Sequence, residues 1–174
     1  MKQPKVIFLV LLSFIVSGCG TIFKVTKTVD TIDPYISVYK SSKIKVIGNS
    51  IEDRYETYLT FIASVNRGKA TYYFNFIYRG QKWAGLSKLK LNIDGVKSTY
   101  QITKQPIQSA NNLTGLTEQL SFKIPTNKIE ELIENRKCKV TIVGSDLDVK
   151  FDFKQEWFDN LIKFYVEVNK GLKI

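Results

Sequence analysis

The stretch from Leu89 to Ile102 constrains the fold most, because it specifies a β-hairpin together with its register. Asp94-Gly95 within it is typical of a two-residue type I′ turn, which needs a positive φ at both central residues. Pairing across the turn places Ile93 opposite Val96, and the apolar residues of both strands then fall on one face. The residues expected on the other, water-exposed face are Lys90, Asn92, Lys97, Thr99 and Gln101.

Two further strands are predicted on either side of a turn at residues 66–69. Residues 55–65 alternate well between the two faces of a strand. The stretch 70–78 carries aromatic residues on both of its faces, which predicts a central strand that is covered on both sides. The alternative is an exposed aromatic face that binds a ligand in the concavity of the sheet. The candidate contact residues for that alternative are Tyr72, Phe74, Phe76 and Trp83.

Two helices are predicted towards the carboxy terminus. Asn127, with Glu130 three residues later, has the spacing of a capping box and predicts the start of a short helix. A longer helix is expected from about Gln155 to Asn169, because its apolar residues share one face and Gly171 can terminate it. Together these segments predict an α+β fold. It would consist of an antiparallel sheet or sandwich of about eight strands, a short internal helix, and a carboxy-terminal amphipathic helix packed on one face.

The stretch from Thr103 to Thr117 has little periodicity and contains Pro106 and Gly115. It is predicted to be the longest loop, and long loops in compact domains often carry function. A second, glycine-bounded loop at residues 79–85 contains Trp83. Its indole is expected either to contact a partner or to fold back on the edge of the sheet.

The chain begins with a segment that is typical of a secretory signal. Lys2 and Lys5 precede an apolar run at residues 6–16, which is too short to span a bilayer as a helix. Small residues follow, and the sequence Val-Ser-Gly-Cys at residues 16–19 resembles the lipobox of bacterial lipoproteins. This resemblance covers only the first 20 residues of the chain.

The resemblance implies that Cys19 is a lipidation site: its thiol receives a diacylglyceryl group, and a dedicated signal peptidase then cuts between Gly18 and Cys19. The new amino terminus is often acylated too, and two or three acyl chains hold a protein firmly where one binds marginally. Aspartate after the cysteine retains such proteins in the inner membrane of enterobacteria. Gly20 at this position therefore implies the outer membrane, facing the periplasm, if the source is Gram-negative.

The expected organisation is a cleaved signal peptide at residues 1–18, the lipidated cysteine and a short tether at 19–34, and a single α+β domain at 35–174. Removal of 18 of the 174 residues leaves 156, enough for one domain with its own core. The formal net charge of +10 is compatible with contact with anionic headgroups, lipopolysaccharide or wall polymers, but the favoured interpretation is a solvated, lysine-rich surface. No nucleic-acid partner is expected, because the positive residues are mostly scattered lysines rather than the arginines that suit base readout.

The sequence carries no recognisable catalytic motif. It contains no histidine, which excludes Ser-His-Asp and Cys-His catalysis and histidine-ligated zinc. It has no P-loop or CxxC motif, so neither a cofactor nor a metal site is predicted. Asp146, Asp148 and Asp152 lack the spacing of a calcium loop and have Lys150 among them, which favours a solvated strand. Cys138 alternates with polar residues and is expected to be buried and inert.

These observations favour a non-enzymatic protein that is held to membrane lipid through Cys19 and binds another envelope protein as an accessory subunit of an envelope assembly. The alternative is a lipoprotein that binds a small molecule or a lipid through the aromatic sheet face. An enzyme is a third hypothesis, which would need a cleft with clustered acids or a lysine with a shifted pKa.

Overall fold

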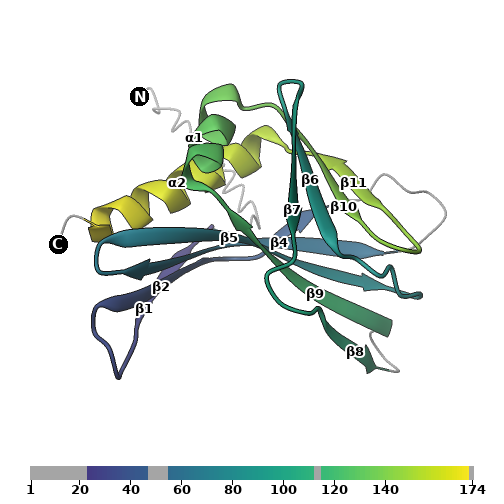
Figure 1. Ribbon diagram of the computed structural model, residues 1–174, viewed down its shortest axis with the longest axis horizontal. Coiled ribbons are helices and arrows are strands. Elements are labelled where there is room, and N and C mark those ends of the chain that lie inside the picture. Colours follow the sequence, from purple (N-terminus) through teal and green to yellow (C-terminus); the bar gives the residue numbers. More distant parts are fainter. Residues whose placement is uncertain (1–22, 47–54, 112–114, 173–174) are drawn as a thin grey trace, which may run out of the picture.

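A computed structural model describes residues 23–46, 55–111 and 115–172, and it confirms the α+β fold (Figure 1). The described residues form two antiparallel sheets and two helices. These sheets contain eleven strands, where the sequence predicted about eight. Cys19 and the signal segment lie outside the described residues.

The larger sheet has seven strands in the order β1-β2-β4-β5-β9-β8, with β3 also paired to β4. Its strands are β1 (Val25–Val29), β2 (Ile36–Ser41), β3 (Ile44–Val46), β4 (Glu56–Asn66), β5 (Lys69–Gly80), β8 (Ile107–Asn111) and β9 (Gly115–Ile124). The tether predicted at residues 19–34 and the loop predicted at 103–117 were wrong where they include β1 and β8. Both are short edge strands with mostly exposed side chains, so burial imposes no alternation on their sequences.

The smaller sheet has four strands in the order β11-β10-β6-β7. Its strands are β6 (Lys88–Ile93), β7 (Val96–Gln101), β10 (Cys138–Val143) and β11 (Val149–Asp152). The helices are α1 (Thr126–Asn135) and α2 (Gln155–Leu172). The N-cap of α1 is Pro125, without a capping side chain, so the predicted cap at Asn127 was wrong. Figure 1 shows both helices and the smaller sheet on the same side of the larger sheet.

One hydrophobic core fills the space between the larger sheet, the smaller sheet and α2. Phe61 of β4 lies against Phe164 of α2, with ring centroids 5.8 Å apart. Phe76 of β5 lies 6.3 Å from Phe151 of β11, which joins the two sheets through the same core. Such aromatic pairs bury large areas and favour tilted or edge-on packing. The core therefore covers one face of the larger sheet.

The β6–β7 hairpin confirms the register predicted for residues 89–102. Ile93 pairs with Val96 across the turn, and Asp94 and Gly95 both have positive φ, at 45° and 95°. The apolar residues of β6 are fully buried, whereas Val96 of β7 is 56% exposed. Strand β7 lies at the edge of the smaller sheet, so β6 supplies the fully buried side chains of the hairpin, and Tyr100 of β7 packs against the core only partly buried.

A buried carboxylate fixes the segment between β5 and β6, where the chain passes from one sheet to the other. Glu118 of β9 is fully buried. Its Oε1 accepts hydrogen bonds from the backbone N–H of Ala84 at 2.5 Å and of Gly85 at 3.0 Å, and its Oε2 accepts one from Leu86 at 3.0 Å. Three backbone donors thus satisfy both oxygens of one buried side chain, as burial of a polar group requires. We call this arrangement the Glu118 latch.

Candidate functional site

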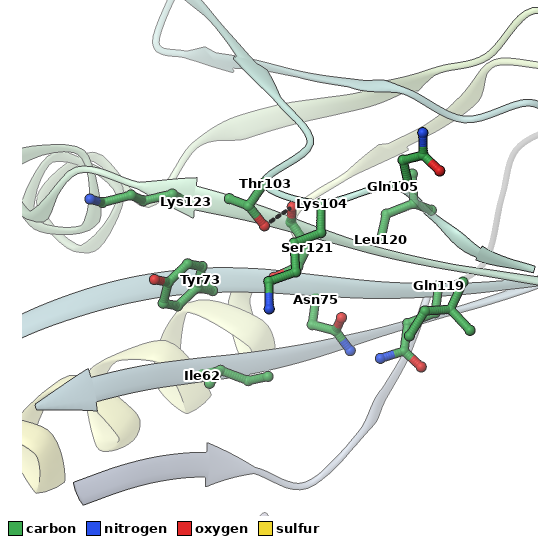
Figure 2. Close-up of a pocket in the computed structure, with 11 residues that line it drawn as sticks. Ile62, Tyr73, Asn75, Thr103, Lys104, Gln105, Gln119, Leu120, Ser121 and Lys123 are labelled. Carbon is green, nitrogen blue, oxygen red and sulfur yellow. Dashed lines mark hydrogen bonds between the residues drawn. The ribbon is translucent and has the colours of Figure 1, made fainter. Parts of the chain in front are cut away.

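A hollow lies on the face of the larger sheet opposite the core, and its volume is about 590 Å³ (Figure 2). Its floor comes from adjacent positions on β4, β5 and β9. Its wall comes from the segment between β7 and β8 and from the first residue of β8. We call it the sheet groove. The floor consists of Ile62, Tyr73, Asn75, Gln119 and Ser121, and the wall of residues 103–105 with Ile107.

The strand register brings the floor residues together. Tyr73 of β5 pairs with Ile62 of β4 and, on its other side, with Lys123 of β9. The next outward residue of β5, Asn75, pairs in the same way with Thr60 and Ser121. Figure 2 shows Ile62, Tyr73, Asn75, Ser121 and Lys123 on the three strands. Asn75 is only 6% exposed, which makes it a deep polar point on an otherwise uncovered face.

The wall is fixed to the floor by backbone contacts. Both the N–H and the hydroxyl of Thr103 donate hydrogen bonds to the carbonyl oxygen of Ser121, at 2.9 Å and 3.0 Å. The preceding residue, Ile102, forms an isolated β-bridge with Phe122. Residues 103–105 therefore stand over β9 as an ordered rim. This rim and Ile107 are the parts of the predicted loop that line the groove.

The groove offers hydrogen bonds and positive charge to a bound molecule. Asn75 and Gln119 present carboxamides, which can both donate and accept, and Lys104 and Lys123 add ammonium groups at its margin. Its described lining residues include no carboxylate and no thiol. This composition suits a bound molecule that carries hydrogen-bonding groups and negative charge.

The groove lies beside an open strand edge. Strand β8 is the last in its sheet, and no strand among the described residues pairs with its other side. All five of its side chains are exposed, and Ile107, which lines the groove, is 67% exposed. An extended chain can add to such an edge through backbone hydrogen bonds. The edge and the groove thus form one continuous surface.

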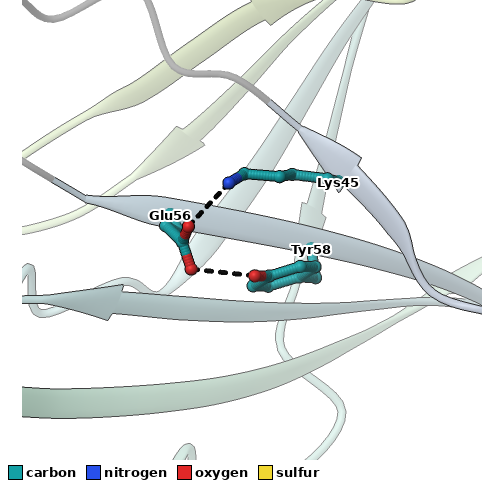
Figure 3. Close-up of polar contacts among 3 residues, drawn as sticks. All are labelled: Lys45, Glu56 and Tyr58. Carbon is teal, nitrogen blue, oxygen red and sulfur yellow. Dashed lines mark hydrogen bonds and ion pairs between the residues drawn. The ribbon is translucent and has the colours of Figure 1, made fainter. Parts of the chain in front are cut away.

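A polar cluster lies further along the same outer face, on β3, β4 and β5. Glu56 accepts hydrogen bonds from Lys45 at 2.6 Å and from the Tyr58 hydroxyl at 2.8 Å (Figure 3). Arg79, the cross-strand partner of Glu56, has its guanidinium 5.6 Å from the Tyr58 ring centroid. The hydrogen bond from Lys45 is the largest cause that lowers the pKa of Glu56, and the same bond raises the pKa of Lys45. Both groups therefore stay charged near neutral pH and satisfy each other.

The structure overturns three of the predicted contact residues. Tyr72, Phe74 and Phe76 are at most 2% exposed, because they face α2 and the smaller sheet. Burial also raises the pKa of the Tyr72 hydroxyl. The neighbouring Tyr73, on the opposite face of the same strand, lines the sheet groove instead. The coverage predicted for both faces of this strand holds only in part, because no described helix or second sheet packs on the outer face, although Asn75 is buried there and the other outward side chains of residues 71–79 are half-buried.

The remaining predicted residues lie away from the groove. Trp83 is 37% exposed in the segment between β5 and β6 and is not among the residues that line the groove. Cys138 is buried, as predicted, and burial raises the pKa of its thiol to about 12. Asp148 pairs weakly with Lys150 at 3.7 Å, and no group of three potential metal ligands is found among the described residues.

No match was found when the chain was compared with models of protein families, with curated proteins and with solved structures. Among the described residues, neither helix combines the length and the apolar character that a membrane span requires. The groove, the polar cluster and the surface charges are thus the features from which function can be inferred.

Proposed function

We propose that this protein is a lipid-anchored bacterial envelope lipoprotein with a non-enzymatic role, in which the sheet groove binds an extended segment of a partner envelope protein. The observation that carries the proposal is the position of a hollow lined by carboxamides directly beside an open strand edge. The proposed anchor is Cys19, and the proposed location is the outer membrane, facing the periplasm of a Gram-negative cell.

The chemistry of the groove supports a polypeptide as the bound molecule. A carboxamide can pair with both the N–H and the C=O of a peptide group, and Asn75 and Gln119 offer two such partners on adjacent strands. The volume of about 590 Å³ lies within the usual range of ligand sites. Lys104 and Lys123 favour a segment that carries acidic side chains or a terminal carboxylate.

Site-specific photo-crosslinking in native membranes tests this proposal directly. A photoreactive amino acid would replace Ile107 at the groove, or, as a control, Val166 on α2, which is also apolar and exposed. We expect a discrete protein adduct from position 107 and none of the same mass from position 166. Adducts only with lipid or glycan at position 107, or identical adducts from both positions, would overturn the proposal.

Substitution of two glutamines, one in the groove and one on the strand edge outside it, tests whether the partner binds in the groove. Gln119 faces the groove, whereas Gln108 is the cross-strand partner of the inward-facing Glu118 and is exposed away from the groove. Gln119→Ala should lower the yield of the adduct from position 107 about fivefold, the loss expected for one or two hydrogen bonds. Gln108→Ala should leave it unchanged. Equal adduct yields from both variants would argue against binding of the partner in the groove.

The anchor has a separate test. Cys19→Ala should give an unprocessed, unacylated chain whose mass and membrane extraction differ from those of the parent protein. An unchanged mass would contradict the lipidation proposal without bearing on the groove.

A further inference from the structure

The outer face of the smaller sheet is strongly cationic. Strict alternation in β6 sends its leucines into the core and its lysines outward, and the neighbouring strands follow the same pattern. We call this surface the lysine face. It carries Lys88, Lys90, Lys97, Lys139 and Lys150.

Antiparallel pairing gathers these charges around one shallow hollow. Asn92 of β6 lies between Lys97 on β7 and Lys139 on β10. In the next row, Lys90 lies between two threonines. The resulting hollow has a volume of about 390 Å³. Ammonium, hydroxyl and carboxamide groups line it, and its described lining residues include no carboxylate.

Most of these lysines form no ion pair with a described residue, and Lys90, Lys97 and Lys139 are among them. The nearby acids are Asp152, which is the cross-strand partner of Lys139 on β11, and at the margins Asp94 and Asp148, which pair with Lys137 at 3.4 Å and with Lys150 at 3.7 Å. The five lysines still outnumber these acids on the face. Like charges close together on adjacent strands repel one another. An anionic surface bound to the lysine face would reduce that repulsion and would attract all of these lysines.

We propose that the lysine face binds the anionic phospholipid headgroups of the membrane to which the protein is anchored. Lysine ammonium groups act as point charges towards phosphates, and the outer face of these four strands offers no arginine fork and no aromatic ring on which a nucleic-acid base could stack. Juxtamembrane lysines are attracted to anionic leaflets, and acyl chains with a basic patch hold more firmly than acyl chains alone. The proposal rests on the lipid anchor but not on the partner of the sheet groove.

Amine footprinting of the full-length acylated protein in vesicles tests it. The protein would be reconstituted into phosphatidylcholine alone or into an equal mixture of phosphatidylcholine and phosphatidylglycerol, and lysine acetylation would be followed by mass spectrometry. We expect acetylation of Lys90, Lys97 and Lys139 to slow about fivefold on the anionic vesicles, and this protection to vanish at high salt. Lys69 and Lys163, exposed on other surfaces, should react equally on both vesicles.

A charge-neutral variant makes the test specific. Replacement of Lys90, Lys97 and Lys139 by glutamine should abolish the lipid-dependent protection of Lys88. Replacement of Lys69, Lys82 and Lys163 by glutamine is the matched control and should retain it. Circular dichroism would verify that both variants are folded.

Three results would overturn the proposal. The first is equal acetylation of the lysine face on neutral and anionic vesicles. The second is equal protection by inorganic phosphate alone, which would make the hollow a site for small anions. The third is protection of Lys69 and Lys163 to the same degree. If the protein is not lipid-anchored, it will not float with neutral vesicles, and this result is distinct from the three above. The photo-crosslinked adduct from position 107 tests binding in the sheet groove independently of both.

Discussion

The outer faces of the two sheets share one core but differ in shape and charge. The larger sheet presents a groove lined mainly by neutral groups, with Tyr73 and Asn75 at its floor. The smaller sheet presents a face dominated by lysines, around a hollow of smaller volume. A sheet that is buried on one side leaves its other side free to vary, so each face can take a separate role. The comparison suggests that one face recognises a segment of protein while the other meets a charged surface.

Strand length accounts for much of the difference in shape. Strands β4 and β5 have 11 and 12 residues, whereas no strand of the smaller sheet exceeds six. Twist accumulates along paired strands, so long strands curve more than short ones. The chain between β7 and β8 then stands over the curved face and deepens it. The groove thus arises from strand length and topology as much as from composition.

Substitutions on the two faces of β5 should differ most in how far they lower the free energy of unfolding. Phe74→Ala removes a fully buried ring and should lower the free energy of unfolding by about 4 kcal/mol, because it leaves a cavity. Tyr73→Ala, one residue away on the groove side, should cost about 1 kcal/mol and should weaken the adduct from position 107. Denaturant unfolding measures both. Equal losses of stability would mean that the groove floor is part of the core.

Removal of the Glu118 latch should have the next largest effect. Glu118→Ala leaves three buried backbone donors without an acceptor and should lower the free energy of unfolding by about 3 kcal/mol. Glu118→Gln keeps one accepting oxygen and should cost less. Thr117→Ala, at the preceding outward position of the same strand, is the control and should change stability by about 0.5 kcal/mol or less. A loss no larger than the control would show that the two sheets stay joined without the latch.

The polar cluster around Glu56 should contribute least to the stability of the fold, because its charges are largely exposed. Glu56→Gln should lower the melting temperature by roughly 2 °C or less at neutral pH. The pKa of Glu56 is lowered in the folded state, so its contribution is complete above its ordinary pKa of 4.5 and is lost as the pH falls through the folded value. The melting temperatures of parent and variant should therefore converge in acid. A constant difference down to low pH would assign the effect to packing instead of charge.

Local patterns were predictable where a turn fixed the register. Asp94-Gly95 determined the β6–β7 hairpin and therefore the outward positions of Lys90 and Lys97. That Lys139 joins them depends on the pairing of β6 with β10, which are more than 40 residues apart, and no local signal specifies that pairing. The lysine face was thus visible only in part from the sequence.

The groove and the latch were harder to predict. Aromatic residues on both sides of residues 70–78 did signal two occupied faces, but alternation alone could not say which face belongs to the core. The pattern therefore pointed to Tyr72, Phe74 and Phe76 as contact residues, whereas Tyr73 lines the groove. Glu118 resembled an ordinary polar strand residue, because its partners are backbone groups more than 30 residues earlier in the chain.

The open edge of the larger sheet also bears on the behaviour of the protein in concentrated solution. The opposite edge strand, β1, carries Lys27, whereas β8 contains no charged residue. Charged side chains on edge strands discourage chains from pairing edge to edge, and an uncharged, exposed edge lacks that protection. When no partner occupies it, β8 is the point at which two copies would pair, so lone protein at high concentration should associate through this strand before any other surface.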